Sequence, residues 1–330
     1  MGIVDSYRLR LRRKRWHLRA FRRRHELRPV VDRTSDLRRT DILLFCTLRN
    51  ERIRLPWFLD FYRRIGVNHF FFVDNDSGDG GREYLAQQPD VSLWTTKASY
   101  ARSRFGVDWL NLLLRRHAHG HWALTVDVDE FLVYPFSDTR PLRALTDWLD
   151  TCAIRSLGAM MVDMYPKGRI ADARYAEGQD PLEIASWFDG GNYQISRNPD
   201  LRNLWIQGGP RARMFFADAP SKAPALNKVP LVKWHRNYAY VSSTHMLLPR
   251  GLNQVYDSGG GEKASGCLLH AKFIDTFEGK TAEESQRQQH YGREYAAYDT
   301  QPVLWTRWSE QYVNWRQLEM LGLMSKGNWA

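Results

Sequence analysis

Apolar runs alternate with segments of helical periodicity between residues 41 and 135 of this 330-residue chain. Continuous apolar runs are typical of strands that are buried on both faces of a sheet. The expected strands span 41–48, 67–73, 91–96 and 122–126, and the expected helices span 56–65, 82–88 and 108–120. The alternation of strands with helices predicts an α/β fold with a mostly parallel central sheet flanked by helices.

Three polar loops follow the apolar strands. Their sequences are TLRNE after residue 46, DNDSGDGG after residue 73 and DVDE after residue 126. Ligands of open parallel sheets bind beyond the carboxyl ends of the strands, and these ends share one edge of the sheet. We therefore expect the three loops to converge on one binding edge.

The stretch WALTVDVDEFLVYP (122–135) carries three carboxylates at the end of an expected core strand. If the strand continues, Asp127 and Asp129 share one face and Glu130 points to the other. Two carboxylates on one face suit Mg²⁺ or Mn²⁺, or a shared proton. A solvated pair at a strand end is the alternative, although the apolar flanks make solvation harder.

The pattern loosens beyond residue 135. A helix is expected at 141–150 and a strand at 157–165, while residues 166–245 look rich in loops. Residues 281–330 are rich in aromatic residues and look helical. Most of the thirteen tryptophans are expected in the core rather than at a ligand.

Positive charge is concentrated at the N-terminus. Residues 1–40 contain 14 Lys or Arg and 4 Asp or Glu, whereas the rest of the chain contains 34 and 33. Residues 8–24 place Trp16, Leu18 and Phe21 among ten basic residues. A basic helix with apolar anchors suits an anionic membrane surface. A solvated, unstructured tail and a nucleic-acid-binding arm are the alternatives, and nucleic acid is the less favoured partner.

Three cysteines without a CxxC pair favour a reducing compartment. No apolar stretch approaches the length of about 18 residues that a membrane span requires. We expect a cytoplasmic protein, with peripheral contact to the inner face of the cell membrane if the basic arm binds lipid.

The ordered motifs resemble a known family. CTLRNERIRLPWFLDFYRRIGVNHFFFVDNDSGDGG followed by WALTVDVDEFLVYP resembles the family 2-like glycosyltransferases of the GT-A fold, in particular a bacterial branch with a DxDEF motif. The layout is also similar to family 92 enzymes. The resemblance covers 41–135 and extends more weakly through KVPLVKW, SSTHML and LLHAKF to about residue 280. Leu55-Pro56 departs from the family, which often has an acidic residue before the tryptophan.

The resemblance implies a nucleotide-sugar donor, with a UDP-sugar as the leading expectation, and a Mn²⁺ or Mg²⁺ ion that bridges its diphosphate. The implied donor-binding residues are Thr47, Asn50, Glu51, Asp74, Asn75 and Asp127. The implied metal ligands are Asp127 and Asp129, with His270 as a late histidine and His245 as its competitor. Lys272 is placed to meet phosphate. Arg211 is a candidate for the diphosphate or an anionic acceptor, with a surface ion pair as the alternative.

Inverting transfer requires a carboxylate base that accepts the proton of the acceptor hydroxyl. Asp189 and Asp163 are the candidates. Glu130 is either catalytic or a residue that orients the metal ligands.

These expectations divide the chain into a basic arm (1–40), a GT-A catalytic domain (41–280) and a C-terminal helical extension (281–330). Within the catalytic domain, 41–135 forms the nucleotide-binding half and 136–280 the acceptor half. We expect transfer to a cell-surface glycan or a lipid-linked acceptor. A nucleotidyltransferase of similar architecture is one rival, although TLRNERIRLP lacks the Gly-rich basic loop it would require. A nucleic-acid-binding protein with a basic arm is the other rival.

Overall fold

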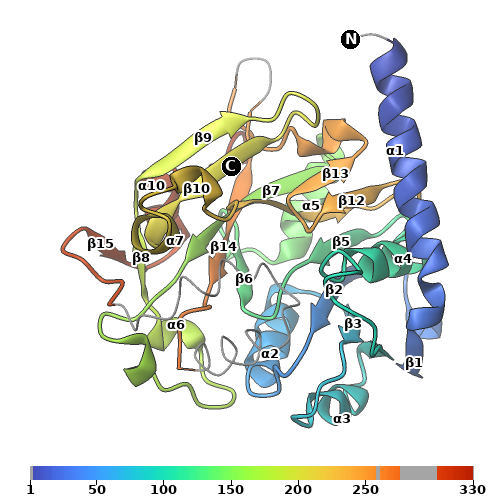
Figure 1. Cartoon of the computed structure of the whole chain (residues 1–330), viewed down its shortest axis with the longest axis horizontal. Coiled ribbons are helices and arrows are strands. Elements are labelled where there is room, and N and C mark those ends of the chain that lie inside the picture. The colour runs from blue at the N-terminus through green and yellow to red at the C-terminus, as the bar shows by residue number, and fades with distance from the viewer. Residues whose placement is uncertain (1–2, 258–260, 276–302, 330) are drawn as a thin grey trace.

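The computed structural model describes residues 3–257, 261–275 and 303–329 (Figure 1). Its helices are α1 (Ile3–Arg22), α2 (Leu55–Ile65), α3 (Gly81–Ala86), α4 (Val107–His117), α5 (Leu142–Thr151), α6 (Pro181–Ile184), α7 (Gly209–Phe215) and α10 (Trp315–Met320). Its strands are β1 (Arg28–Val31), β2 (Ile42–Leu48), β3 (His69–Asp74), β4 (Val91–Thr95), β5 (Trp122–Thr125), β6 (Glu130–Val133), β7 (Ser156–Asp163), β8 (Trp187–Asp189), β9 (Tyr193–Arg197), β10 (Leu204–Gly208), β11 (Asn227–Lys233), β12 (Ala239–Ser242), β13 (Met246–Leu248), β14 (Ser265–His270) and β15 (Ser309–Gln311).

A nine-stranded sheet forms the centre of the described structure, in the order β1-β4-β3-β2-β5-β11-β7-β14-β6. The strands β4, β3, β2 and β5 pair in parallel, and β7 pairs in parallel with β14. Because β11 is antiparallel to both β5 and β7, six of the nine strands run in one direction. The predicted α/β fold with a mostly parallel central sheet is confirmed.

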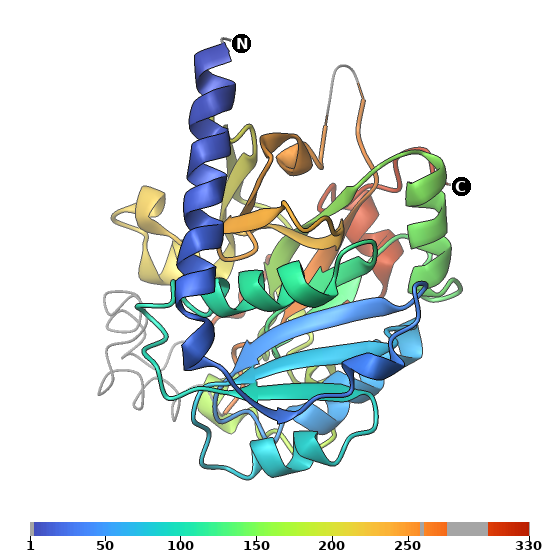
Figure 2. The same ribbon diagram turned by 90° about the vertical axis from the view of Figure 1, so that its right-hand side faces the viewer.

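Helices cover both faces of this sheet, as Figure 2 shows. Alternate residues of β2 contribute to two different clusters: Ile42 and Leu44 pack with α2 and α5, and Leu43 and Phe45 pack with α4. All four side chains are fully buried. The continuous apolar run of this strand is therefore explained by burial on both faces.

The predicted helix after β2 is confirmed as α2, which ends at Gly66. This glycine has a positive φ of 105°, and its N–H bonds to the carbonyl of Arg63 at 3.0 Å. A side chain would be strained in this left-handed conformation, so the glycine stop follows from backbone geometry.

The condition that the strand continues through the DVDE stretch is not met, so Asp127 and Asp129 do not share a strand face. The strand β5 ends at Thr125, and β6 begins at Glu130 and pairs with β14 at the far edge of the sheet. The intervening residues turn, with the N–H of Glu130 bonded to the carbonyl of Asp127 at 3.1 Å. The carboxylates therefore lie on a turn rather than on one strand face.

The prediction that residues 166–245 are rich in loops is wrong for residues 227–233, which form a central strand. This region contributes β11, which lies between β5 and β7 in the centre of the sheet. Pro230 lies within this strand, and a proline is unfavourable in a central strand because it lacks an N–H. An irregularity in the register with β7 between Lys228 and Leu231 accommodates it.

The predicted C-terminal helical extension lies partly outside the described residues, because the structure does not describe 276–302. Within 303–329 the chain forms the short strand β15 and the six-residue helix α10. Most residues of 303–329 are therefore not helical. The domain boundaries at residues 40, 135 and 280 stay predictions.

The N-terminal basic segment is folded against the body. The helix α1 packs along α4, and β1 pairs with β4 at one edge of the sheet (Figure 1). Leu9 and Ala20 of α1 are buried. The alternative of a solvated, unstructured tail is therefore wrong for the described residues of this segment.

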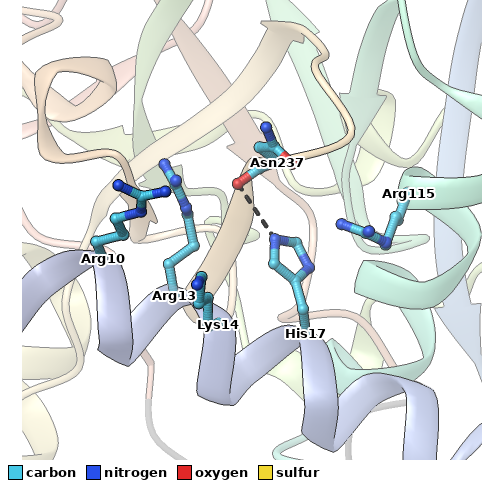
Figure 3. Close-up of a pocket in the computed structure, with 6 residues that line it drawn as sticks. All are labelled: Arg10, Arg13, Lys14, His17, Arg115 and Asn237. Atoms are coloured by element: carbon cyan, nitrogen blue, oxygen red, sulfur yellow. Dashed lines mark hydrogen bonds between the residues drawn. The ribbon is translucent and has the colours of Figure 1, made fainter.

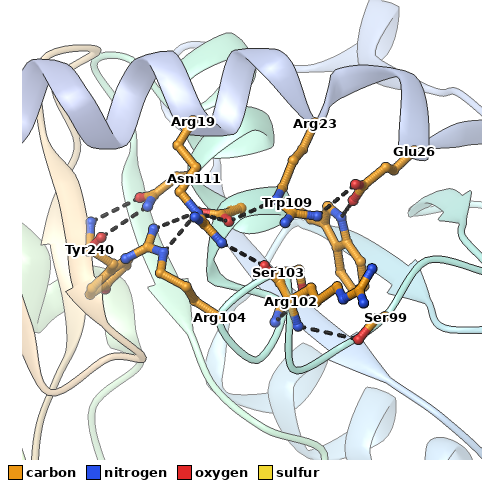
Figure 4. A network of polar contacts seen from close by, with 12 residues as sticks. Arg19, Arg23, Glu26, Ser99, Arg102, Ser103, Arg104, Trp109, Asn111 and Tyr240 are labelled. Atoms are coloured by element: carbon orange, nitrogen blue, oxygen red, sulfur yellow. Dashed lines mark hydrogen bonds and ion pairs between the residues drawn. The ribbon is translucent and has the colours of Figure 1, made fainter. Parts of the chain in front are cut away.

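A buried carboxylate fastens α1 to α4. The side chain of Asp108 is fully buried and accepts hydrogen bonds from Arg19 Nε at 2.7 Å and Arg104 Nη2 at 2.7 Å. Arg23 Nε lies 3.2 Å from the same carboxylate. Figure 4 shows the side chains of Arg19 and Arg23 reaching from the N-terminal helical segment toward the part of the body that carries Arg104 and Trp109. Three guanidinium groups therefore share one buried anion. The buried carboxylate is stable only because these positive charges compensate for its loss of hydration.

We predict that Asp108→Asn lowers the free energy of unfolding by about 2 kcal/mol, because it leaves the partly buried guanidinium groups of Arg19 and Arg104 without their anion. Urea denaturation of the full chain measures the loss. The matched control is Asp60→Asn, which removes an exposed ion pair with Arg64 on α2; we expect a loss below about 0.5 kcal/mol there. Equal losses in both variants would contradict the assigned role of Asp108.

Candidate functional site

Charged side chains gather at the carboxyl edge of the parallel strands. The strands β2, β3, β5, β7 and β14 end at this edge, and the antiparallel strands β6 and β11 begin there. The sheet therefore brings together residues that are far apart in sequence: Asp74, Asp127, Asp129, Glu130, Asp163, Lys228 and His270. The predicted convergence of the polar loops on one edge is confirmed.

A row of ion pairs runs through the middle of this edge. His270 Nδ1 donates to Asp163 Oδ1 at 2.7 Å, and Arg211 Nε donates to Asp163 Oδ2 at 2.7 Å. The other ring nitrogen, His270 Nε2, lies 3.4 Å from Asp129 Oδ2. The Asp163 side chain is 1 % exposed, so Arg211 and His270 occupy both of its oxygens away from solvent.

Each charged group in this row stabilises the charged form of its neighbours. Burial alone would raise the pKa of Asp163, but the charges of Arg211 and His270 hold it at about 2. Burial alone would lower the pKa of His270, but Asp129 and Asp163 raise it to about 9. In this structure the imidazole is therefore protonated at neutral pH and clamped between two carboxylates.

A second ion pair involves a lysine that the sequence analysis missed. Lys228 Nζ lies 2.8 Å from Glu130 Oε1 and 3.5 Å from Asp127 Oδ2, and the lysine side chain is 4 % exposed. Burial raises the pKa of Glu130, whereas Lys228 opposes that shift. Lys228 is the second residue of β11, and a lysine that opens an apolar run, as in KVPLVKW, is the signal that could have identified it.

Asp127 and Glu130 differ in exposure. The Asp127 side chain is 54 % exposed, whereas that of Glu130 is 1 % exposed. The Glu130 carboxylate also accepts a hydrogen bond from the Asp127 N–H at 3.2 Å, which closes the turn. The Asp127 side chain is therefore accessible to solvent, whereas the buried Glu130 side chain stabilises the turn.

The second loop is organised by Asp74 and Asn75. The fully buried Asp74 carboxylate accepts hydrogen bonds from the Ser77 N–H at 3.3 Å and the Thr95 hydroxyl at 3.2 Å. The Asn75 amide donates to the carbonyls of Thr96 and Ala98 at 3.1 and 3.0 Å. These contacts shape the loop, and the role of both residues in donor binding stays a prediction.

The first loop is tied to the second loop and to the end of β14. Asn50 Oδ1 accepts from the Gly78 N–H at 3.0 Å, and Glu51 Oε2 lies 3.4 Å from Arg54 Nε. Arg54, which is buried, donates to the carbonyl of Ala271 at 2.9 Å. The first loop is therefore connected to the end of β14, because Arg54 binds Ala271, the residue that follows His270.

Thr47 and Lys272 also lie near this edge. Gly106 has a φ of 76°, and a Cβ atom there would come within 2.8 Å of Thr47 Oγ1, so the loop before α4 can approach Thr47 only with glycine. Lys272 is half-buried two residues after His270. Their assignment to nucleotide-sugar binding stays a prediction.

The candidate bases occupy different environments. Asp189 binds Arg213 through both carboxylate oxygens, at 2.8 and 3.0 Å, and accepts a hydrogen bond from the Tyr165 hydroxyl. Its side chain is 11 % exposed. Since Asp163 is more deeply buried and is held by Arg211 and His270, the geometry favours Asp163 as a residue that orients His270 and leaves Asp189 as the more accessible carboxylate.

His245 does not join the row of ion pairs. Its Nδ1 donates to the carbonyl of Asn227 at 2.6 Å. Burial and the charge of Lys228 lower its pKa to about 4, so this imidazole is neutral. Between the two candidate histidines, the contact with Asp129 favours His270 as the one placed for a metal.

The described residues contain no cluster of three or more His, Cys, Asp or Glu side chains arranged as a ready metal site. The donor set nevertheless suits a cation in part, because Asp129 and His270 face each other and Asp163 orients the imidazole from behind. A carboxylate that holds the second ring nitrogen is a frequent partner of metal-bound histidine.

Comparisons with known proteins do not identify the chain. No protein-family model matches it, and no curated protein matches it. One similar solved structure is a 4-diphosphocytidyl-2C-methyl-D-erythritol synthase, with 17 % identity and a TM-score of 0.26. The match covers 42 % of this chain and 66 % of that chain, slightly less than two thirds of its length. A likeness this weak identifies neither the family nor the activity of this chain.

We predict that Lys228→Met destabilises the fold by about 3 kcal/mol at neutral pH, because Glu130 then becomes a buried carboxylate without a cation. Burial already raises the pKa of Glu130, and loss of Lys228 raises it further. When folding raises the pKa of a carboxyl group, the free energy of unfolding falls as the pH rises above the pKa that the group has in the unfolded chain. The deficit relative to the unmodified chain should therefore be larger at pH 8 than at pH 5 in urea denaturation.

The double variant Lys228→Met with Glu130→Gln is the control, since it removes both charges. We expect it to lose the pH dependence and to recover part of the stability. A deficit in Lys228→Met that is equal at pH 5 and pH 8 would contradict the ion pair.

Proposed function

We propose that this chain is a metal-dependent glycosyltransferase that moves a sugar from a nucleotide-sugar donor, foremost a UDP-sugar, to a cell-surface glycan or lipid-linked acceptor. The observation that supports it most is the meeting of Asp129 with His270 at the carboxyl edge of the sheet, with His270 oriented by Asp163. This is the edge at which open α/β sheets bind their ligands.

The charge balance around His270 and Lys228 favours a divalent cation. Asp127, Asp129, Glu130 and Asp163 supply four carboxylates. Lys228 and Arg211 supply two fixed positive charges, so two negative charges remain. A protonated His270 cancels one of them, whereas a divalent cation with a neutral His270 cancels both. Carboxylates held this close are stabilised by a cation of higher charge.

Asp129 and His270 are the residues that would hold Mn²⁺ or Mg²⁺, with Asp127 on the exposed side of the turn. An imidazole ligand favours Mn²⁺, since Mg²⁺ takes oxygen ligands. When bound, the cation would stabilise the charge that develops on the leaving nucleoside diphosphate. Lys228 and Glu130 hold the turn in shape, and Arg211 fixes Asp163.

The first two loops supply the proposed nucleotide pocket. Thr47 and Asp74 lie near the ends of β2 and β3. Asn50, Glu51 and Asn75 lie on the loops that follow these strands, and a hydrogen bond between Asn50 and Gly78 ties the two loops together. Lys272, just beyond β14, is proposed to meet a donor phosphate.

Asp189 is the proposed base for inverting transfer. Arg213 and Tyr165 orient its carboxylate, and its side chain keeps contact with solvent. A carboxylate positioned in this way can accept the proton of an acceptor hydroxyl as the new glycosidic bond forms.

The proposed activity is tested by incubating the full chain with a panel of nucleotide sugars and following release of the nucleoside diphosphate. We predict turnover of at least one donor with Mn²⁺, loss of turnover with EDTA, and a fall in kcat/KM of at least about 10³-fold for Asp129→Asn. The control Asp147→Asn replaces an exposed carboxylate of α5 that takes no part in the ion pairs described at the edge, and it should leave the rate unchanged.

Absence of donor turnover and donor binding across the panel, or equal rates for both variants, would contradict the proposal. Release of pyrophosphate from a nucleoside triphosphate, with no reaction of any nucleotide sugar, would indicate a nucleotidyltransferase instead.

The role of Asp189 is tested by comparing Asp189→Asn with Arg213→Gln. Loss of the base should lower kcat by about 10²–10⁴-fold while leaving the KM for the donor and the donor affinity close to their original values. Arg213→Gln keeps the carboxylate and should lower kcat much less. Equal losses in both variants would show that the pair acts as a structural unit and that the base lies elsewhere.

A further inference from the structure

Two apolar rows lie on opposite faces of α1. One row, which includes Leu9 and Ala20, is buried against the body. The other row remains exposed, and its side chains have exposed fractions of 61 % for Tyr7, 47 % for Leu11, 49 % for Leu18 and 52 % for Phe21. Spacings of four, seven and three residues place these four side chains on one face of a helix.

This outer row differs from the anchors that the sequence suggested. Leu18 and Phe21 do face outwards, but Trp16 is half-buried and its ring lies 4.0 Å from the guanidinium of Arg104. Trp16 therefore helps to hold α1 on the body, and Tyr7 and Leu11 take its place in the exposed row. Lys14 lies on the same face, between Leu11 and Leu18, so one charged residue interrupts the row. An exposed apolar row on a helix surface indicates an interaction site rather than a core.

Positive charge lies on both sides of the exposed row, and Lys14 lies within it. Arg8, Arg10, Lys14, Arg15 and Arg22 are exposed on α1, and Asp5 is the acidic residue among its described side chains. Arg8 has a solvent-exposed contact with Asp200 at 3.4 Å, which weakens its charge only slightly. The outer face of α1 is therefore both apolar and strongly basic.

A basic pocket opens beside this face, between α1 and the end of α4 (Figure 3). Its volume is about 260 Å³, and its lining residues are Arg10, Arg13, Lys14, His17, Arg115 and Asn237. His17 Nε2 donates to the carbonyl of Asn237 at 3.2 Å. Burial and the nearby charge of Arg10 lower the pKa of Arg13, as expected where like charges crowd together. The lining contains no carboxylate, so an anion would relieve the crowding.

We propose that the outer face of α1 docks on an anionic lipid bilayer, with its exposed apolar row inserted among the lipids and the neighbouring basic pocket bound to a lipid phosphate group. A helix with an apolar row between basic flanks lies in the plane of the bilayer interface. None of the helices among the described residues is long and apolar enough to cross a membrane. The arrangement therefore favours a surface contact. The proposal rests on α1 and the pocket beside it, and it does not depend on the proposed glycosyl transfer.

The apolar row distinguishes a bilayer from nucleic acid. Nucleic-acid phosphates would be neutralised by the basic residues alone, and they would leave Tyr7, Leu11, Leu18 and Phe21 exposed to water. A bilayer satisfies both features, because lipid phosphates meet the basic side chains while acyl chains cover the apolar row.

The proposal is tested by co-sedimentation of the full chain with vesicles of phosphatidylcholine, with or without about 30 % phosphatidylglycerol, at low salt. We expect binding to the anionic vesicles that weakens as salt is added, and little binding to the neutral ones. The triple variant Leu11→Gln, Leu18→Gln and Phe21→Gln should bind anionic vesicles at least about thirtyfold more weakly. Glutamine is a good helix former, and the replaced side chains are exposed, so the fold should persist.

The matched control replaces three exposed apolar residues that lie outside α1, in the triple variant Ile195→Gln, Val313→Gln and Met320→Gln. It should bind as the unmodified chain does. Circular dichroism and thermal unfolding of both triple variants check that any loss of binding is not a loss of structure.

The basic part of the surface has its own variant pair. Arg10→Gln with Lys14→Gln should weaken binding to anionic vesicles by roughly fivefold per charge, and the exposed pair Lys222→Gln with Arg307→Gln should not.

Three results would overturn the proposal. The first is failure of the unmodified chain to bind anionic vesicles, including the case in which it binds duplex DNA instead. The second is undiminished binding by the α1 triple variant. The third is a dimer in sedimentation velocity that the α1 triple variant converts to a monomer without any vesicle binding by the unmodified chain, since this would assign the face to a second copy of the chain. None of these readouts depends on donor turnover, so the proposed glycosyl transfer is tested separately.

Discussion

Concentration of negative charge at one edge of the sheet is the constraint on which the rest of this structure depends. Besides Asp74, four carboxylates lie there on strand ends and turns, and three of these four have side chains less than 20 % exposed. Such a cluster is stable only with buried cations nearby. Lys228 and Arg211 supply them from β11 and α7, elements that follow residue 135 in sequence. The second half of the chain is therefore required for the first half to hold its carboxylates in place.

The same logic holds in the first turn of α4. Asp108 is buried under α1 and is neutralised by arginines of α1 and of the preceding loop. The basic N-terminal segment thus has two functions on two faces of one helix. Its inner arginines satisfy a buried anion, and its outer ones remain in solvent beside an apolar row. The excess of positive charge in residues 1–40 is explained by both faces together.

Local signals in the sequence were sufficient for the first half of the sheet and insufficient for the second. The apolar run of β2 and the glycine after α2 are determined by short-range physics, namely burial on two faces and a left-handed backbone. By contrast, β11 contains Pro230, which argues against a central strand unless the register slips, and the slip is set by β7, which is distant in sequence. The turn at Asp127–Asp129 could not be predicted either, because it is set by the pairing of β6 with β14 across the sheet. Lys228 was missed because its partners lie about one hundred residues earlier in the chain.

The most direct measurement of the central claim is titration of the full chain with Mn²⁺ by isothermal calorimetry, with and without UDP. If Asp129 and His270 hold a cation against the nucleotide diphosphate, one Mn²⁺ should bind per chain, UDP should tighten its binding, and Asp129→Asn should abolish it. Absence of Mn²⁺ binding in both conditions, or binding that Asp129→Asn leaves unchanged, would contradict the account.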